Sequence, residues 1–338
     1  MRTMFRLIKE NLEKGNDLVL VTVVASSGST PRGAGARMLV GSQGRIHGTI
    51  GGGAVEYRSE QIAGKLLAEG NSGEYDFSLT KDDVQNLGMI CGGAVNVFFA
   101  YLPAGDAHTL SVAEAAEQMF AEGHDLWLLS DNRNGGKLSL YSRERGFVGC
   151  EARDWILPSL TRHPCRVTEN GEDIYCEQIH SSGRVYVFGC GHVAQELVPV
   201  LSHLGFRCVA LDDRADFARR ELFPTAEEVK LIDFTRIADT VTVTEEDYVC
   251  VMTRGHAFDT VVQAQMLQTD AYYIGVIGSP FKKAGVIRKL KEEYGFADEV
   301  FARITSPIGL DIKAETPAEI AVSIAGQLIE LRARRNAL

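Results

Sequence analysis

The pattern of hydrophobic and polar positions differs between the two halves of the chain. In the first hundred residues the pattern alternates between helical and strand periods. It predicts helices over residues 3–14 and 54–69, and strands over 18–25, 36–40, 45–50, 75–79 and 94–102. A weaker pattern follows, predicting a helix over 111–122 and strands over 125–129, 137–141 and 173–179. We interpret residues 1–181 as one N-terminal α+β domain.

From Arg184 onward, buried-type strands and helices alternate regularly. The pattern predicts a first helix over 192–204 and strands over 184–188, 207–211, 248–252 and 271–277, with helical stretches between and after the last two. This alternation predicts a parallel sheet covered on both faces. The last helix should begin at a capping box, Thr316-Pro317-Ala318-Glu319. The fold class is therefore α/β, with a C-terminal Rossmann-type domain over residues 182–338.

Composition narrows the function classes. The 34 glycines among 338 residues fall in clusters, which indicates loops where backbone approaches a ligand. A net charge of −10 argues against nucleic acid as a partner. No continuous apolar segment resembles a signal peptide or is long enough to span a membrane, so we expect a cytoplasmic protein without membrane contact. The seven cysteines include no Cys-x-x-Cys pair, which favours free thiols.

A glycine-rich turn connects the first strand and helix of the C-terminal half. Gly189, Gly191 and Ala194 fit Gly-x-Gly-x-x-Ala, and His192 opens the helix. Asp212 follows the second strand, 23 residues after Gly189, where an acid can bind a ribose hydroxyl. The motif predicts binding of a nucleotide-like phosphate, although a Rossmann fold without a ligand would look similar. Arg214 leaves the choice between NAD and NADP open.

Two more loops follow strands at the edge where this fold class binds ligands. One contains Arg254 and His256, with Asp259 a turn later, and the other contains Gly278 and Lys283. Arg254, His256 and Asp259 could clamp an anion or serve acid–base chemistry. Alternatively, Asp259 only opens a helix and pairs with Arg254.

The N-terminal half contains two glycine-rich loops and an unusual cysteine. Residues 27–37 include Arg32, and residues 48–56 include Gly51, Gly52 and Gly53. Such loops form anion-binding nests of backbone N–H groups, although both could be tight turns. Cys91 precedes two glycines, which would leave a thiolate open to bind a soft metal or attack an electrophile. The alternative for Cys91 is a small buried residue.

Taken together, these segments resemble the xanthine dehydrogenase accessory factors of the XdhC/CoxI type. The matching segments run in order through nearly the whole chain, except about residues 106–180. They are Gly28-Ser-Thr-Pro-Arg32, Gly48–Gly53 with Glu56, Cys91-Gly92-Gly93, Phe188–Ala194, Asp212-Asp213-Arg214, Thr253–His256, Ile277–Ser279, Pro307–Asp311 and Thr316–Ile324. The chain departs from the family pattern at Lys313, Pro280-Phe281 and Gly326-Gln327, which affects details of the C-terminal loops.

The resemblance implies a role in maturing a molybdenum hydroxylase. Such factors bind the molybdenum–pterin cofactor (molybdopterin), hold it while a cysteine desulfurase supplies its terminal sulfido ligand, and pass it to the apoenzyme. The family ties the cysteine of the Cys-Gly-Gly motif to the cofactor, which makes Cys91 the candidate metal ligand. The candidate cofactor-binding residues are Gly189, Gly191, His192, Asp212, Arg254, His256, Gly51, Gly52, Gly53 and Arg32.

Three functions compete. The first is a cofactor chaperone without turnover, and the second is an NAD(P)-dependent oxidoreductase with Arg254, His256 and Asp259 as catalytic candidates. The third is a scaffold that bridges desulfurase and target enzyme. A dehydrogenase gives no role to the Cys91 loop, and a scaffold needs no glycine-rich ligand loops. We therefore favour the chaperone and assign no catalytic residue. The sequence leaves open whether NAD(P) also binds and whether the chain forms a homodimer.

Overall fold

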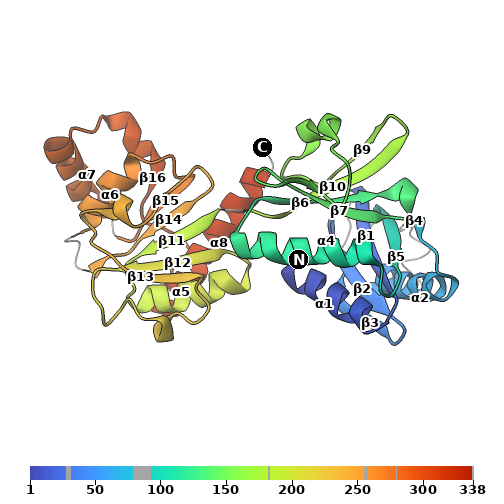
Figure 1. Ribbon diagram of the computed structural model, residues 1–338. Helices are drawn as coiled ribbons and strands as arrows, with labels where there is room; N and C mark the ends of the chain where they lie inside the picture. Colours follow the sequence, from blue (N-terminus) through green and yellow to red (C-terminus); the bar gives the residue numbers. More distant parts are fainter. Residues whose placement is uncertain (28–31, 79–92, 182, 255–257, 279, 337–338) are drawn as a thin grey trace. The chain divides into compact units, whose positions relative to one another are not determined.

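The chain divides into two compact units, Met1–Ser181 and Ser182–Leu338, each with its own sheets and core (Figure 1). The computed structural model describes residues 1–27, 32–78, 93–181, 183–254, 258–278 and 280–336. Within these residues, no helix is both long and apolar enough to cross a bilayer.

The first unit contains two five-stranded sheets, and every strand pairing in them that the structure describes is antiparallel. The first sheet has the order β3-β2-β1-β5-β4, with β1 (Leu18–Ser27), β2 (Arg37–Gly41), β3 (Gly44–Thr49), β4 (Gly73–Ser78) and β5 (Ala94–Leu102). The second has the order β8-β7-β6-β10-β9, with β6 (Leu126–Asp131), β7 (Lys137–Ser142), β8 (Gly146–Val148), β9 (Cys165–Glu169) and β10 (Glu172–His180).

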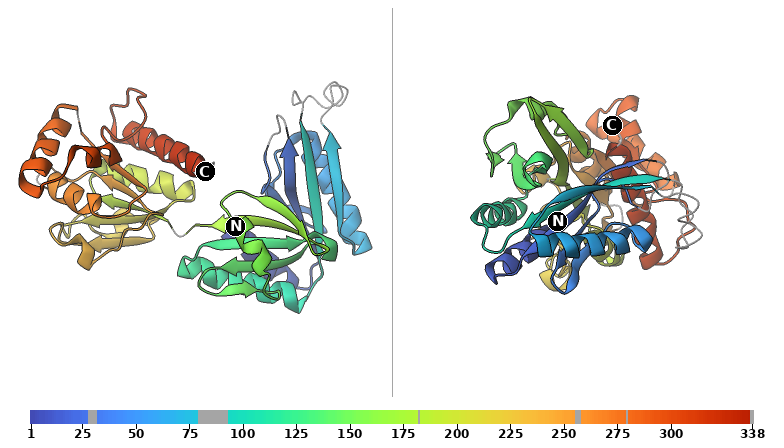
Figure 2. Two further views of the ribbon diagram at one scale, coloured as in Figure 1. Left: turned by 90° about the horizontal axis from the view of Figure 1, so that it is seen from above. Right: turned by 90° about the vertical axis from the view of Figure 1, so that its right-hand side faces the viewer.

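Helices fill the space around these sheets. Helices α1 (Arg2–Glu13) and α4 (Ala107–Glu122) share one hydrophobic core with both sheets. Helix α2 (Gly53–Glu69) packs against the other face of the first sheet (Figure 2). The 3₁₀ segments η1 (Asn132–Asn134) and η2 (Asp154–Ser159) belong to the second sheet's region, and η2 packs on its outer face. The weak pattern over 106–180 therefore encodes a helix and a complete sheet.

A buried ion pair joins the two sheets of the first unit. Arg37 on β2 places Nη2 at 2.7 Å from Oε2 of Glu177 on β10, and the two side chains are 3% and 14% exposed. The Tyr175 hydroxyl donates to the same carboxylate oxygen at 2.9 Å. Because a charge taken out of water is costly without its partner, this contact couples the two sheets.

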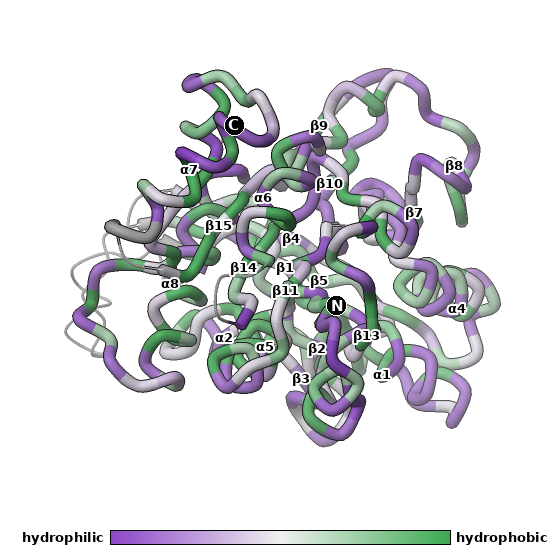
Figure 3. The backbone as a smooth tube through the Cα atoms, turned by 90° about the vertical axis from the view of Figure 1, so that its left-hand side faces the viewer, coloured by the Kyte–Doolittle hydropathy of each residue, from purple (hydrophilic) through white to green (hydrophobic). Residues whose placement is uncertain are grey.

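The second unit is built on one parallel sheet of order β13-β12-β11-β14-β15-β16. Its strands are β11 (Arg184–Phe188), β12 (Arg207–Asp212), β13 (Glu228–Leu231), β14 (Tyr248–Val251), β15 (Tyr273–Val276) and β16 (Ile304–Thr305). Helices α5 (His192–His203) and α8 (Pro317–Asn336) cover one face, and α6 (Asp259–Leu267) and α7 (Pro280–Tyr294) cover the other. Hydrophobic residues concentrate in the strands of this sheet (Figure 3).

This architecture confirms the predicted Rossmann-type domain with a parallel sheet. Alternate residues of β11 face opposite layers: Val185 and Val187 pack toward α5 and α8, while Tyr186 and Phe188 pack toward α6. The capping box at the start of α8 is also confirmed. The Thr316 N–H donates to the Glu319 carboxylate at 3.0 Å, and the Glu319 N–H donates to the Thr316 hydroxyl at 3.3 Å. The connection from β12 to β13 carries only the 3₁₀ segment η3 (Arg220–Leu222).

Candidate functional site

The order of strands in the second unit reverses at β11. The chain leaves β11 toward β12 on one side, and β14 lies on the other side. Ligands of open parallel sheets bind where the strand order reverses in this way. The loops that follow β11 and β14 therefore form the candidate site.

Gly189 holds these two loops against each other. Its φ is +105°, a conformation that L side chains rarely adopt. A Cβ at this position would lie 2.4 Å from the carbonyl oxygen of Met252, in the loop after β14. The Gly189 N–H donates to the Leu211 carbonyl at 2.7 Å. Only glycine fits this position, because both the backbone conformation and the close approach exclude a side chain.

Gly191 lies at the open mouth of the same turn. Its φ is −72°, so its backbone would accept other residues, and a Cβ there would meet no atom within 4 Å. His192 follows as an exposed residue in the first turn of α5. The first N–H groups of a helix have no partners within it, and the helix dipole makes this end positive. This end of α5 thus offers donors and free space to a phosphate.

Asp212 accepts hydrogen bonds from the protein at the end of β12. Its side chain is 1% exposed, and Oδ2 accepts the Cys190 N–H at 2.7 Å. The Arg214 side chain donates to both carboxylate oxygens, with Nε at 2.8 Å and Nη2 at 2.9 Å. Although burial acts in the opposite direction, the hydrogen bonds from Arg214 and Cys190 lower the pKa of Asp212. Asp212 therefore fixes the glycine turn in this structure, and its role as a ribose acceptor stays a prediction.

The helix that follows the β14 loop begins with a second carboxylate that already accepts a hydrogen bond from the protein. Asp259, on the first turn of α6, is 1% exposed and accepts a hydrogen bond from the buried Thr253 hydroxyl. The alternative that Asp259 opens a helix is confirmed. Its burial removes it as an accessible acid or base. Arg254 is exposed, and its pairing with Asp259 stays a prediction. His256 lies outside the described residues.

The loops of the N-terminal half leave the first sheet from one end. Ser27 at the end of β1 pairs with Ala94 at the start of β5, and Ala94 also pairs with Ser78 at the end of β4. Thr49 at the end of β3 pairs with Arg37 at the start of β2. Arg32, between β1 and β2, is exposed. Cys91 lies outside the described residues, as do residues 28–31.

The Glu56 carboxylate accepts several hydrogen bonds from the loop that contains Gly51–Gly53. Its Oε2 accepts the N–H groups of Ile50 at 3.0 Å and Gly52 at 3.1 Å, and also the Thr49 hydroxyl. The Gly51 N–H donates to the Thr49 hydroxyl at 3.1 Å. In this structure an internal hydroxyl and an internal carboxylate accept the N–H groups of Gly51 and Gly52. Anion binding by these glycines stays a prediction. Gly53 begins α2.

We expect Glu56→Gln to reduce the free energy of unfolding of the first unit by about 1–3 kcal/mol. Burial opposes ionisation, yet the hydrogen bonds from Thr49, Gly52 and Ile50 lower the pKa of Glu56. The stabilisation is thus fully present above the unfolded-state pKa of about 4.3 and is lost as the pH falls through the lower folded-state pKa. Urea titrations between pH 3 and 7 should show a smaller acid loss in the variant.

The matched control for this prediction is Glu60→Gln. Arg45 pairs with both Glu56 and Glu60. Its Nε lies 3.2 Å from Glu60 Oε1, but the Glu60 side chain is 31% exposed. Such a pair contributes about 0–1 kcal/mol. Equal effects of the two variants would contradict a special role for Glu56.

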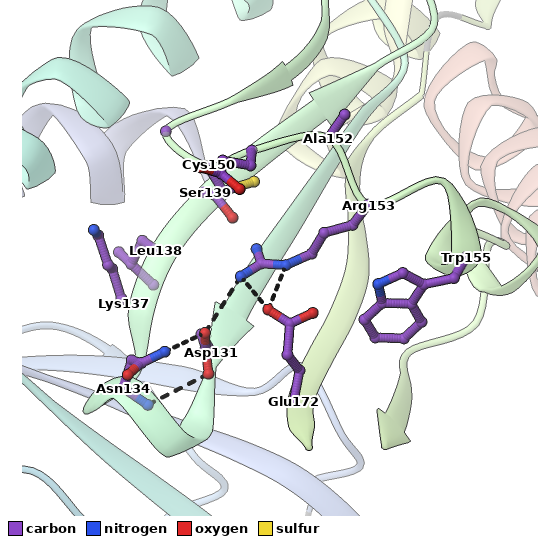
Figure 4. Close-up of a pocket in the computed structure, with 12 residues that line it drawn as sticks. Asp131, Asn134, Lys137, Leu138, Ser139, Cys150, Ala152, Arg153, Trp155 and Glu172 are labelled. Atoms are coloured by element: carbon purple, nitrogen blue, oxygen red, sulfur yellow. Dashed lines mark hydrogen bonds and ion pairs between the residues drawn. The ribbon is translucent and has the colours of Figure 1, made fainter. Parts of the chain in front are cut away.

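A cavity of about 500 Å³ lies on the outer face of the second sheet, and none of the residues that line it is a site residue predicted from the sequence (Figure 4). Arg153 crosses it, with Nη2 at 2.9 Å from Glu172 Oε1 and 3.4 Å from Asp131 Oδ2. Cys150 and Trp155 also line the cavity. Its volume suits a small molecule. Periodicity could not reveal it, because the lining comes from four short segments separated along the chain.

Among the described residues, no cluster of three or more His, Cys, Asp or Glu side chains could hold a metal ion. Six cysteines lie in the described part of the chain, and all six are free thiols. A metal site within these residues alone therefore has no support.

The fold defines a two-unit α/β protein whose C-terminal unit is of the Rossmann type. Comparison with known families identifies the family within this class of folds. A family model described as the XdhC Rossmann domain matches residues 185–328, and the model of the XdhC and CoxI family matches residues 11–78. The chain belongs to the XdhC and CoxI family, which confirms the resemblance seen in the sequence.

Individual relatives are distant but cover nearly the whole chain. The chain is 24% identical to a probable xanthine dehydrogenase subunit from Bacillus subtilis over 337 residues, covering 96% of each. It is 23% identical to the molybdenum cofactor insertion chaperone PaoD of Escherichia coli over 331 residues, covering 98% of this chain and 88% of PaoD. The uncharacterized protein YqeB of E. coli is 22% identical over 95% of this chain, which spans only 44% of YqeB.

A solved structure shares the fold. The crystal structure of a xanthine dehydrogenase from Bacillus halodurans superposes with a TM-score of 0.78 at 24% identity, covering 98% of this chain and 96% of that one.

Proposed function

We propose that this protein is a maturation factor for a molybdenum hydroxylase of the xanthine dehydrogenase type. The observation that carries the proposal is its similarity over 98% of its length to PaoD, a molybdenum cofactor insertion chaperone. In this role it binds the molybdenum–pterin cofactor, supports sulfuration by a cysteine desulfurase and inserts the cofactor into the apoenzyme. The protein itself turns over no substrate.

The described residues fit the phosphate of such a cofactor. The N–H groups of Gly191 and His192 would hold it at the positive end of α5, where a Cβ at position 191 meets nothing. Arg254 would add a cation from the neighbouring loop. When bound, the cofactor would supply the molybdenum centre. Cys91, in the first unit, is proposed as a thiolate ligand to molybdenum independently of this phosphate site.

An NAD(P)-dependent oxidoreductase remains the second candidate, because the same turn suits a pyrophosphate. The described geometry gives it less support. Asp212 is already bound to Cys190 and Arg214, so a ribose hydroxyl would compete with them for its oxygens. Asp259 is buried and bound to Thr253.

We expect the purified apoprotein to retain cofactor released from a donor enzyme through desalting, measured as co-eluting pterin and molybdenum. Cys91→Ala should fold normally and lose the molybdenum cofactor, because the variant lacks the proposed thiolate ligand. Gly191→Val should fold, because φ at position 191 is −72°, and lose the pterin, because its side chain fills the phosphate space.

Two substitutions outside the proposed site serve as controls. Cys150→Ala removes a partly exposed thiol, and Gly285→Ala adds a methyl group in open space on α7. Both should retain cofactor. Full retention by Cys91→Ala would exclude the ligand role. No retention by the wild type, together with NADH or NADPH binding in a titration, would replace the chaperone with the oxidoreductase.

A further inference from the structure

Cys165 and Cys176 lie directly opposite each other on the antiparallel strands β9 and β10. Opposed residues in such a pair have Cα atoms about 4.5–5.5 Å apart. A disulfide spans Cα separations of about 4.4–6.8 Å, so the strand register brings the two Cα atoms within the range that a disulfide requires. Both residues are free thiols here. The side chains extend to the same face of the sheet, where both join one hydrophobic cluster.

The two thiols have different surroundings. Cys176 is 1% exposed and packs with Leu129, Ile156 and Ile174. Cys165 is partly exposed, and its thiol donates to the Ser159 carbonyl oxygen at 3.2 Å. A hydrogen bond from Cys176 lowers the pKa of Cys165 to about 7, and the same bond together with burial raises the pKa of Cys176. An accessible, acidic thiol beside a protected one is the arrangement of a nucleophilic and a resolving cysteine.

We propose that Cys165 and Cys176 form a site of reversible oxidation, at which a hydroperoxide converts the two thiols into a cross-strand disulfide. This inference is independent of the proposed function. The Cys165 thiolate attacks one peroxide oxygen, the O–O bond breaks, and hydroxide leaves, so that Cys165 becomes a sulfenic acid. The Cys176 sulfur then attacks the Cys165 sulfur, the S–O bond breaks, and water leaves. Two electrons pass from the two sulfurs to the peroxide.

Oxidation must also change the segment in front of β9. Once its sulfur is bonded to Cys176, Cys165 has no proton to donate to Ser159, the last residue of η2. Trp155 lies in η2 and lines the cavity of Figure 4. The Trp127 indole N–H donates to the Thr161 carbonyl in the same segment, at 2.8 Å. These are the two tryptophans of the chain, so intrinsic fluorescence reports on this segment.

The test is to treat the native, full-length protein with hydrogen peroxide and count its thiols. We expect Cys165 and Cys176 to lose their thiols together, a reversible change in tryptophan fluorescence, and recovery of both signals with dithiothreitol. Trypsin cleaves after Arg162, Arg166 and Arg184, so the disulfide should link the peptides 163–166 and 167–184. Mass spectrometry would identify this linked pair directly.

Variants separate the two thiol roles. Cys176→Ser should leave Cys165 as a sulfenic acid that a dimedone probe traps, whereas Cys165→Ser should abolish both trapping and the linked peptides. Cys208→Ser, at an equally buried position in the other unit, should leave the linked peptides unchanged. The inference is overturned if the linked peptides are absent from oxidised wild-type protein, or if they form only after denaturation.

Discussion

Gly189→Ala is expected to destabilise the C-terminal unit by about 3 kcal/mol or more. Its Cβ would lie 2.4 Å from the Met252 carbonyl oxygen and 2.7 Å from the Met252 carbonyl carbon, while φ stays at +105°. Both atoms belong to backbone, so no side chain can rotate away. The loop after β14 must move, and the candidate site between the two loops changes shape with it.

Gly191→Ala is the matched control for this prediction. The two glycines share one turn, but a Cβ at Gly191 meets nothing within 4 Å. We expect Gly191→Ala to lower the free energy of unfolding of the C-terminal unit by less than about 0.5 kcal/mol. Because both tryptophans lie in the first unit, hydrogen exchange of the α5 amides is the suitable measurement. Similar protection of α5 in the two variants would contradict the steric argument.

Replacing Arg37 by methionine is expected to destabilise the first unit by about 3–5 kcal/mol. The substitution removes the cation that lies 2.7 Å from the Glu177 carboxylate, in a place where that side chain is only 14% exposed. Among the described residues, the Tyr175 hydroxyl still donates a hydrogen bond to the buried carboxylate. Urea unfolding followed by tryptophan fluorescence measures the effect.

Two further variants show whether the cost comes from the unpaired charge. Adding Glu177→Gln to Arg37→Met removes the stranded charge, so the double variant should be more stable than Arg37→Met. Arg6→Ala removes an exposed pair, Arg6 and Glu10 at 3.9 Å, and should cost about 0–1 kcal/mol. An Arg37→Met cost in that same range would contradict the proposed coupling of the sheets.

The sequence predicts the C-terminal unit well because its signals are local. A strand, a Gly-x-Gly-x-x-Ala turn and a helix follow one another within a few residues of Gly189, and the Thr316–Glu319 capping box lies within one helical turn. The second sheet of the first unit is less predictable. Its strands β6 and β10 pair across more than forty residues, and three-residue β8 is too short for any period to show.

The sequence predicts where the candidate site lies, but not which hydrogen bonds its residues make. The spacing of Asp212 from Gly189 is sufficient to place it near the turn, yet two residues later Arg214 bonds to both of its oxygens. The same holds for Gly51 and Gly52. The sequence shows that their backbone N–H groups are available as donors, but not that Glu56, one helical turn later, accepts the N–H group of Gly52. Hydrogen-bond competition of this kind depends on side-chain directions that composition does not contain.

The direct pairing of Ser78 with Ala94 sets what a change of chain length between them would cost. Because the two strand ends are adjacent, doubling the number of residues that join them costs only about 0.6 kcal/mol of loop-closure free energy. Strands β4 and β5 would keep their register under such a change. We therefore expect this edge of the first sheet to tolerate insertions better than the interior of either strand.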